Sequence, residues 1–185
     1  MDILELIKTR RSIRKYKTDP VSEEDLNKVL QAAQWAPSWA NTQCARFIVV
    51  KDNEIKKKLA NTLSPNNPGK DSLIEAPIVI VACAKTKTSG YYKGEPSTDK
   101  GEYWYMFDVG LSMANLTLMA HALGLGTVHL GAFSAKEVEK ILELPDDMVV
   151  VEMTPLGYPL EKEVKIPPRK PLEELVYFDR YNSKN

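Results

Sequence analysis

The sequence predicts an α+β fold in which helices flank a small central sheet of mixed or antiparallel strands. Segments with a helical hydrophobic period are interspersed with short β-branched segments, and there is no strict strand–helix–strand alternation. Residues 77–84, PIVIVACA, are apolar at nearly every position, which indicates a strand covered on both faces. A chain of 185 residues can bury a core, so we expect one domain.

The first half of the chain contains three helix signals and two strand signals. Ser22 precedes an apolar stripe with a helical period, and Asp25 lies three residues later, as in a relative of the capping box. Asp2 is expected to cap the first helix in the same way. The predicted elements are, in order, a helix over 2–9, a helix from Ser22 to before Pro37, a strand over 47–50, a helix over 54–63 and the buried strand over 77–84.

The second half begins with a long polar connection, residues 86–102, which is typical of a lid, a binding loop or a disordered segment. The helix that follows is apolar around its circumference, so it is expected to be buried, and Gly124 should end it. Ser134 and Glu137 form a capping box for a short helix. The remaining predictions are a helix over 103–123, strands over 127–130 and 148–154, and a short strand over 176–178.

The composition excludes several classes of protein. The 25 basic residues are balanced by 25 acidic ones, whereas a general nucleic-acid binder has a large basic surplus. No stretch reaches the roughly 20 apolar residues that span a bilayer, and the acidic N-terminus is unlike a signal peptide. Of the two cysteines, Cys44 and Cys83, the second is expected to be a buried, reduced thiol. We therefore expect a cytoplasmic protein.

Positive charge is concentrated near the N-terminus although the chain has no net charge. Six of the ten residues in KTRRSIRKYK, Lys8 to Lys17, are cationic. One explanation is a solvated cluster favoured by the negative end of the preceding helix dipole. The other is a phosphate clamp, because arginine presents paired N–H donors that match phosphate oxygens. Arg169 and Lys170, in a proline-stiffened segment, would offer further cations to the same anion.

Two loops and two histidines complete the candidate residues. Residues 36–43, APSWANTQ, can present amide groups to a heteroaromatic ring or can be an ordinary loop. Residues 124–133, GLGTVHLGAF, lack the glycine spacing of a dinucleotide fingerprint, but Gly131 would let a flat ligand approach the backbone. His121 and His129 have no cysteine or carboxylate at metal-ligand spacing, so we expect no metal site and interpret His129 as structural.

Taken in order, four segments resemble the FMN-dependent nitroreductase family, and the resemblance covers nearly the whole chain. The segments are RRSIRKY, APSWANTQCARFIVV, LGLGTVHLGAF, and a C-terminal GYP followed by PPRKPLEELVYF. The resemblance implies a nitroreductase-like sandwich and an obligate homodimer that binds FMN at the subunit interface. It makes residues 1–185 a single FMN-binding domain, with residues 155–185 as an extended C-terminal arm that reaches the partner subunit.

The resemblance also implies a role for each residue that fits the family's pattern. The FMN phosphate and ribityl chain would be held by Arg10, Arg11, Ser12, Arg14, Arg169 and Lys170. The partner subunit would contact the flavin through Pro37, Ser38, Trp39 and Asn41. Leu130 and Gly131 would lie beside the reactive edge of the flavin and offer backbone N–H groups to N5. Tyr91, Tyr92 and Trp104 would line the acceptor pocket, or are ordinary loop and core aromatics.

This sequence departs from the family pattern at one place. The family's usual Gln-Pro-Trp is replaced by Gln43-Cys44-Ala45, so the floor of that pocket lacks the tryptophan. Lys70 is a candidate for the family's contact from the middle of the chain.

The implied activity is that of an NAD(P)H-dependent FMN oxidoreductase. NAD(P)H would deliver hydride to flavin N5 and leave, and a nitroaromatic, quinone or similar small molecule would then accept it, in a ping-pong sequence. FMN carries this chemistry, so no side chain is assigned as catalytic. Two alternatives remain: a specialised reaction on the same fold, such as dehalogenation, flavin fragmentation or metabolite dehydrogenation, and a flavin-binding module without turnover.

Overall fold

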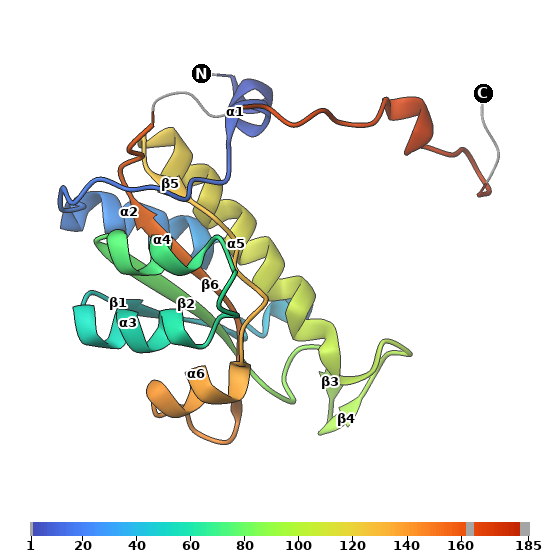
Figure 1. The fold of residues 1–185 in the computed structure, drawn as a ribbon. Helices are drawn as coiled ribbons and strands as arrows, with labels where there is room; N and C mark the ends of the chain where they lie inside the picture. The colour runs from blue at the N-terminus through green and yellow to red at the C-terminus, as the bar shows by residue number, and fades with distance from the viewer. Residues whose placement is uncertain (1, 162–164, 182–185) are drawn as a thin grey trace.

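A four-stranded antiparallel sheet forms the centre of the molecule. The computed structural model describes residues 2–161 and 165–181. Within these residues the strand order is β1–β2–β6–β5 (Figure 1). The strands are Ala45–Val50 (β1), Ile78–Lys85 (β2), Gly126–Thr127 (β5) and Met148–Gly157 (β6). The predicted α+β class is confirmed, and each pairing in this sheet is antiparallel.

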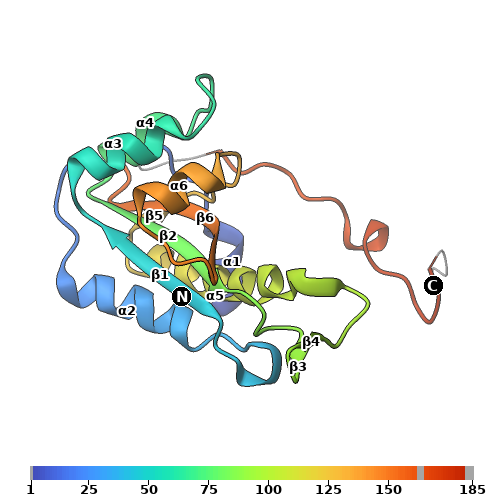
Figure 2. The ribbon, with the colours of Figure 1, turned by 90° about the horizontal axis from the view of Figure 1, so that it is seen from below.

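Helices cover both faces of the sheet, so that Figure 2 shows three layers. On one face, α2 (Glu23–Gln34) and α5 (Trp104–Ala122) pack against alternate residues of β2, including Ile80. On the other face lie α3 (Asn53–Asn61), α4 (Lys70–Glu75) and α6 (Ala135–Ile141), which pack against Val79 and Val81. Successive β2 side chains therefore enter different layers, and the strand is buried from Ile78 to Ala84, as its composition predicts.

The helix ends follow the capping signals at α2 and α5, whereas Asp2, the expected cap of the first helix (Ile3–Thr9), makes no side-chain capping hydrogen bond. The Ser22 hydroxyl accepts a hydrogen bond from the Asp25 N–H at 3.0 Å at the start of α2. At the end of α5, Gly124 has φ +76°. Its N–H donates to the His121 carbonyl, and the Leu125 N–H donates to the Ala120 carbonyl, which is the bonding pattern of a Schellman motif. This motif turns the chain directly from α5 into β5.

Several predicted elements differ from the structure. Helix α4 is not predicted, because its six residues are too few to show a period. Ser134 precedes α6, but its side chain makes no capping hydrogen bond. The strand expected over 176–178 is wrong, because these residues form no strand. The 3₁₀ turn nearest to them is at Leu172–Glu174. The strand predicted over 127–130 is only Gly126–Thr127 in the structure, and Leu130 makes an isolated bridge to Met153. Strand β6 continues to Gly157, three residues beyond its predicted end.

The long connection after β2 is folded. It contains a small hairpin of β3 (Tyr91–Tyr92) and β4 (Glu95–Pro96) and a 3₁₀ turn at Gly101–Tyr103 that leads into α5. This hairpin lies at the N-terminal end of α5, far from α1 (Ile3–Thr9), which lies toward the other end of α5 (Figure 1).

The C-terminal segment leaves the body of the molecule in both views (Figures 1 and 2). Between residues 165 and 181 it makes no helix or strand longer than the 3₁₀ turn. It exposes the large apolar side chains of Ile166, Leu172, Leu175, Val176, Phe178 and Tyr181. Across the described residues, none of the helices is both long and apolar enough to cross a bilayer.

Candidate functional site

The segment after α1 runs along β5 in an extended conformation. Helix α1 ends at Thr9, and Arg10 already has extended backbone angles. Ser12 pairs with Thr127 in a parallel bridge, and the Ile13 N–H donates to the Thr127 carbonyl at 2.9 Å. A Cβ built on Gly126 would lie 2.7 Å from the Ile13 Cβ, so glycine is needed for this close approach. The pairing fixes the direction in which Arg10 and Arg11 leave the backbone.

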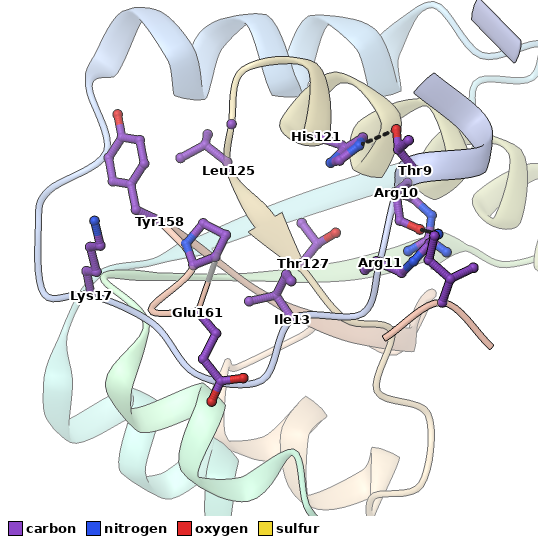
Figure 3. Close-up of a pocket in the computed structure, with 13 residues that line it drawn as sticks. Thr9, Arg10, Arg11, Ile13, Lys17, His121, Leu125, Thr127, Tyr158 and Glu161 are labelled. Atoms are coloured by element: carbon purple, nitrogen blue, oxygen red, sulfur yellow. Dashed lines mark hydrogen bonds between the residues drawn. The ribbon is translucent and has the colours of Figure 1, made fainter. Parts of the chain in front are cut away.

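Two cavities adjoin this segment, and Arg10 and Arg11 line both of them. One cavity, of about 630 Å³, is bounded by His121 and is called the His121 cavity (Figure 3). The other, of about 770 Å³, is bounded by His129 and Arg169 and is called the His129 cavity. Figure 3 shows Thr9, His121 and the two arginines on one side of the His121 cavity. The Thr9 hydroxyl lies 3.0 Å from His121 Nε2, and this contact ties the end of α1 to α5.

Three arginines from the two ends of the chain gather here. Burial, together with the nearby charges of Arg11 and Arg169, lowers the pKa of Arg10. Arg169 lines the His129 cavity with Arg10, although 159 positions separate them in the sequence; its Nη1 donates to the Pro167 carbonyl at 3.1 Å. The prediction that cations from both termini approach one another therefore holds for these arginines.

Arg11 carries the clearest sign of a missing partner. Its Nη1 donates to the carbonyl oxygens of Lys8 and Arg10, each at 2.6 Å. Its Nε and Nη2 are buried and have no hydrogen-bond partner among the described residues. Buried N–H groups of a charged side chain are costly when they are unpaired, so this site favours an anionic ligand.

Three of the predicted phosphate contacts do not face these cavities. Arg14 is exposed and lines neither cavity. The Lys170 Nζ lies 3.7 Å from Glu174 Oε2 instead of facing Arg10, because both side chains lie on the same turn. Ser12 is held beside β5 by the bridge to Thr127 and lines neither cavity. The structure thus unites Arg10, Arg11 and Arg169 but leaves these three outside the group.

Leu130 and Gly131 differ in what their backbones can offer. The Leu130 N–H donates to the Met153 carbonyl at 2.9 Å, and the Met153 N–H returns a bond at 3.0 Å. The expectation that both residues offer a free N–H is therefore corrected. Of the two, only Gly131 has an N–H without a backbone partner among the described residues. A Cβ built on Gly69 would lie 2.3 Å from the Leu130 side chain, which places Lys70, at the start of α4, beside this strand.

The loop after α2 is shaped by left-handed backbone and by one buried carboxylate. Residues Trp39–Asn41 form a 3₁₀ turn in which Ala40 and Asn41 have φ values of 42° and 54°. The Ser38 hydroxyl accepts from the Gln43 N–H at 2.9 Å, and the Trp39 N–H donates to Asp108 Oδ2 at 3.0 Å. Pro37 and Ser38 precede this turn, so the four predicted loop residues form one connected unit.

Asp108 joins this loop to the connection after β2. It is 2% exposed, and its Oδ2 also accepts from the Ser89 hydroxyl at 2.7 Å and from Cys44 Sγ at 3.6 Å. Burial and the Asp108 carboxylate raise the pKa of the Cys44 thiol to about 11. Cys44, Asp108 and Ser112 line a smaller cavity of about 220 Å³ at this place, where the resembled family has a tryptophan nearby. The spacing of Asp108, Ser112 and Asn115 predicts a polar stripe on this helix that holds neighbouring loops or faces a partner subunit, and the contacts of Asp108 agree with the first alternative.

The predicted acceptor-pocket aromatics lie near this loop and away from the arginines. The Trp104 and Trp39 rings meet edge-on with centroids 5.1 Å apart. Tyr91 and Tyr92 form β3, where Tyr92 is 68% exposed and lies under the Lys93 ammonium. Strand β3 lies at the N-terminal end of α5, whereas α1, which Arg10 directly follows, lies toward the C-terminal end (Figure 1). Within one chain, therefore, the aromatics and the arginines do not share a cavity.

His129 was interpreted as structural, yet it lines the cavity that contains Arg169. Its Nδ1 lies 2.8 Å from Glu152 Oε1. The sequence signal for this position is its place directly before Leu130 and Gly131, and its side chain is exposed between the buried Val128 and Leu130.

Comparison with known proteins gives a consistent result over the whole chain. The sequence model of the nitroreductase family matches residues 7–71 and 64–158. An FMN reductase (NAD(P)H) of Bacillus subtilis is 30% identical over 190 residues, which cover 97% of this chain and 74% of the relative. A nitroreductase family protein of Clostridium novyi NT is 30% identical, with a TM-score of 0.78 and coverage of 100% and 97%. An FMN-dependent nitroreductase of Clostridium difficile is 26% identical, with a TM-score of 0.79 and coverage of 97% and 100%.

Proposed function

Because this chain belongs to the nitroreductase family, we propose that it is an FMN-dependent oxidoreductase that uses NAD(P)H to reduce a nitroaromatic, a quinone or a similar small acceptor. The names of its relatives support both FMN and a nicotinamide donor. The observation that carries the proposal is the buried Arg11 guanidinium, whose Nε and Nη2 are unpartnered beside Arg10 and Arg169. Arginines gathered in this way fit a phosphate monoester, because up to two negative charges would relieve their mutual repulsion.

The residues present therefore fit FMN. Arg10, Arg11 and Arg169 would hold its phosphate, and the lowered pKa of Arg10 reflects the burial and the like charges that such an anion would offset. The Gly131 N–H, which has no backbone partner in the described chain, would donate to the flavin edge. The other candidates for this site are Arg14, Lys170 and Ser12. Their side chains would have to turn toward a bound phosphate from the positions that they have in the unbound chain.

When bound, FMN supplies the hydride-transfer chemistry between NAD(P)H and the acceptor. The protein's own part is to bind, orient and polarise. The guanidiniums would fix one end of the ligand, and the Gly131 N–H, four residues after the end of β5, would fix the other. Donors placed near the flavin would stabilise negative charge that develops during reduction. No acid or base among the side chains is required.

We propose further that the chain functions as a homodimer of single-domain subunits, each formed by residues 1–185. In one chain, the loop over 37–41 and the arginines lie near opposite ends of α5, a helix of 19 residues and thus about 28 Å long. A two-fold axis across this helix would bring the loop of one subunit to the arginines of the other, because such an interface pairs each end with its opposite. The C-terminal arm would then lie on the partner subunit.

Exposed apolar residues support this assembly. Met106 and Phe107 of α5 are 49% and 58% exposed in the single chain, although the helix was expected to be buried on all sides. The apolar side chains of the arm are exposed as well. Exposed apolar side chains in this number are a liability for a monomer, and burial in a dimer would remove them from water.

The proposed function is tested with the purified protein and its reconstitution with FMN. We expect a yellow protein whose flavin absorbance is bleached by NADH or NADPH in the absence of oxygen and restored by a quinone or nitroaromatic. Yellow protein that neither nicotinamide bleaches would support a flavin-binding module without turnover. Colourless protein that cannot be reconstituted with FMN would contradict the proposal.

A further inference from the structure

His129 occupies a place in the His129 cavity that the proposed function does not use. It follows Thr127 and Val128, which are buried, and its own side chain is 44% exposed. It directly precedes Leu130 and Gly131, which are expected to lie at the flavin. Its cavity also contains Arg10, Arg11 and Arg169. The imidazole therefore shares a cavity with the cations proposed to bind the phosphate, and in the sequence it adjoins the residues proposed to meet the ring.

The imidazole is held by a carboxylate on the neighbouring strand. His129 Nδ1 lies 2.8 Å from Glu152 Oε1 and 3.0 Å from Oε2, and the Glu152 side chain on β6 is 17% exposed. A carboxylate can only accept, so this contact places the ring proton on Nδ1. Nε2 is left to accept a hydrogen bond when the ring is neutral and to donate one when it is charged.

The charges around His129 oppose one another. Glu152 on β6 contributes a negative charge beside the imidazole, while Arg10, Arg11 and Arg169 contribute positive charges to the same cavity. Helix α1 adds Glu5 and Lys8 to the cavity, which pair with each other at 3.2 Å. Helix α5 contributes Ala114, Thr117 and Leu118, none of which is charged. Histidine is the side chain among these whose charge ordinarily changes between about pH 5 and 8.

Resting on the proposed FMN function, we propose that His129 contacts the bound flavin through Nε2, and that Glu152 is the positioning residue that orients the ring and stabilises its charged form. In the reductive half-reaction, the C–H bond of NAD(P)H breaks and its electron pair and proton move as hydride to the flavin. NAD(P)H is oxidised to NAD(P)⁺, and the flavin is reduced and gains one negative charge.

A charged imidazole beside the flavin stabilises that added negative charge. The arginines remain charged at every relevant pH, so they cannot make reduction depend on pH. His129 can, because it loses its charge as the pH rises. Lowering the pH should consequently make the flavin of this protein easier to reduce. The increase should be larger than in an enzyme that lacks this histidine.

The test is the reduction potential of FMN-loaded protein, measured by equilibration with a redox dye across the pH range. At about pH 6 we expect His129→Gln to lower the equilibrium constant for flavin reduction about tenfold, which is about 30 mV for a two-electron couple. At about pH 9, where the imidazole is neutral, the variant and the wild type should coincide. In a plot of reduction potential against pH, Glu152→Gln should shift the inflection seen in the wild type to lower pH. Lys57→Gln, which changes an exposed cation on α3 outside both arginine-lined cavities, is the control and should follow the wild type.

A second measurement needs neither FMN nor a His129 variant. The chain has two histidines, so a ¹⁵N-histidine NMR spectrum of the apoprotein contains two rings. We expect one ring with its proton on Nδ1 at neutral pH, and we expect Glu152→Gln to abolish that tautomer. A His129 ring protonated on Nε2 in the wild type would overturn the proposal, even if the His129 variant failed to fold.

The outcomes separate this inference from the function on which it rests. A wild-type protein that binds FMN and is bleached by NAD(P)H, together with a His129→Gln variant of identical potential at every pH, would overturn only the role of His129. A wild-type protein that binds no FMN would overturn both. A potential that converges with the variant at high pH and diverges at low pH would support both.

Discussion

The Arg11 guanidinium is hydrogen-bonded on one side only. Nη1 reaches the carbonyl oxygens at the end of α1, while Nε and Nη2 stay buried and unpartnered among the described residues. In the unbound protein this arrangement costs free energy, because a desolvated charge lacks compensation. An anion that pairs with Arg11 therefore gains twice, by forming a charge-assisted bond and by removing an unpaired group.

We predict that Arg11→Ala weakens FMN binding by about tenfold to a hundredfold, since a hydrogen bond to a charged group contributes about 1.5–3 kcal/mol. Fluorescence quenching of FMN on titration with apoprotein measures this affinity. The same variant should unfold in urea at a concentration no lower than the wild type, because it removes a buried unpaired charge.

Lys57→Ala is the matched control for this prediction. Lys57 is an exposed cation on α3 that pairs with Glu54 at 2.7 Å, outside both arginine-lined cavities. Its loss should leave FMN affinity unchanged. Arg14→Ala and Lys170→Ala should have smaller effects than Arg11→Ala. An Arg11→Ala protein with wild-type affinity would show that the phosphate binds elsewhere.

Asp108 gives a second prediction at this scale. Its Oδ2 accepts from the Trp39 N–H, the Ser89 hydroxyl and the Cys44 thiol, so its removal leaves buried donors without an acceptor. We expect Asp108→Ala to lower the free energy of unfolding by about 3 kcal/mol, as urea denaturation would measure. Tryptophan fluorescence should change too, because the Trp39 loop would lose its anchor beside Trp104.

Two variants make this result specific to the hydrogen bonds. Asp108→Asn keeps an acceptor oxygen, and it should cost less than Asp108→Ala. Asp99→Ala removes a carboxylate that is 87% exposed, and it should change stability by about 0.5 kcal/mol or less. Equal losses for Asp108→Asn and Asp108→Ala would indicate that the negative charge, and not the acceptor geometry, holds the two loops.

At the scale of single residues, the sequence identified types of chemistry better than contacts. Clustered arginines near both termini correctly indicated that cations would meet, because guanidiniums at a helix end and in a proline-rich segment have few other uses. The sequence did not show that Lys170 pairs with Glu174, or that the Leu130 N–H donates to the Met153 carbonyl. Such choices depend on which groups the fold brings within about 3 Å, and local sequence carries no signal for them.

At the scale of elements, strand β2 contains a buried thiol that should make the stability of the fold depend on pH. Burial raises the pKa of Cys83, in the centre of this strand, to about 12, with a smaller contribution from the Glu139 carboxylate. In the unfolded chain the same thiol ionises near its ordinary pKa of about 8.5. The native state therefore keeps a proton that the unfolded state releases at alkaline pH. The stabilisation is complete below the unfolded pKa and is lost as the pH rises toward the folded one.

We predict that the free energy of unfolding falls as the pH rises above about 9, and that this thiol contributes up to about 1.4 kcal/mol per pH unit. Urea denaturation at several alkaline pH values, with wild type and Cys83→Ala compared at each, isolates its share from that of other titrating groups. The difference between the two proteins should shift in favour of Cys83→Ala as the pH rises. A difference that stays constant with pH would contradict a buried neutral thiol.

The elements themselves were predicted where a local rule decides them. The Ser22 cap and the glycine at the end of α5 are formed as expected, because each satisfies backbone groups within a few residues. Helix α4 and the 3₁₀ turn at Leu172–Glu174 were not predicted, since short segments show no period. Val176 is β-branched and the next two residues are aromatic, which favours a strand, but residues 176–178 belong to neither sheet of the described structure.

The whole molecule separates two groups that the proposed activity needs together. Loop 37–41 is tied by Asp108 to the first turns of α5, and the arginines lie toward the other end of the same helix. The exposed Met106 and Phe107 lie on the same helix. If the subunits pair across α5, one interface buries these apolar side chains and completes two equivalent sites. Each site then contains arginines from one subunit and a loop from the other.

This arrangement predicts complementation between two defective proteins. Arg11→Ala removes the cation from one half of a shared site, and Asn41→Ala removes a loop side chain from the other half. In a mixed dimer, both substitutions fall in one site and the second site is intact. Random exchange of subunits between equal amounts of the two variants should thus restore about a quarter of all sites, since about half of the dimers are mixed and each has one intact site.

The restored sites are counted by titration of tightly bound FMN after unfolding and refolding the two variants together, with each variant refolded alone as the control. If loop and arginines instead serve the same subunit, every site keeps one defect, and the mixture would bind no more FMN than the average of the two variants.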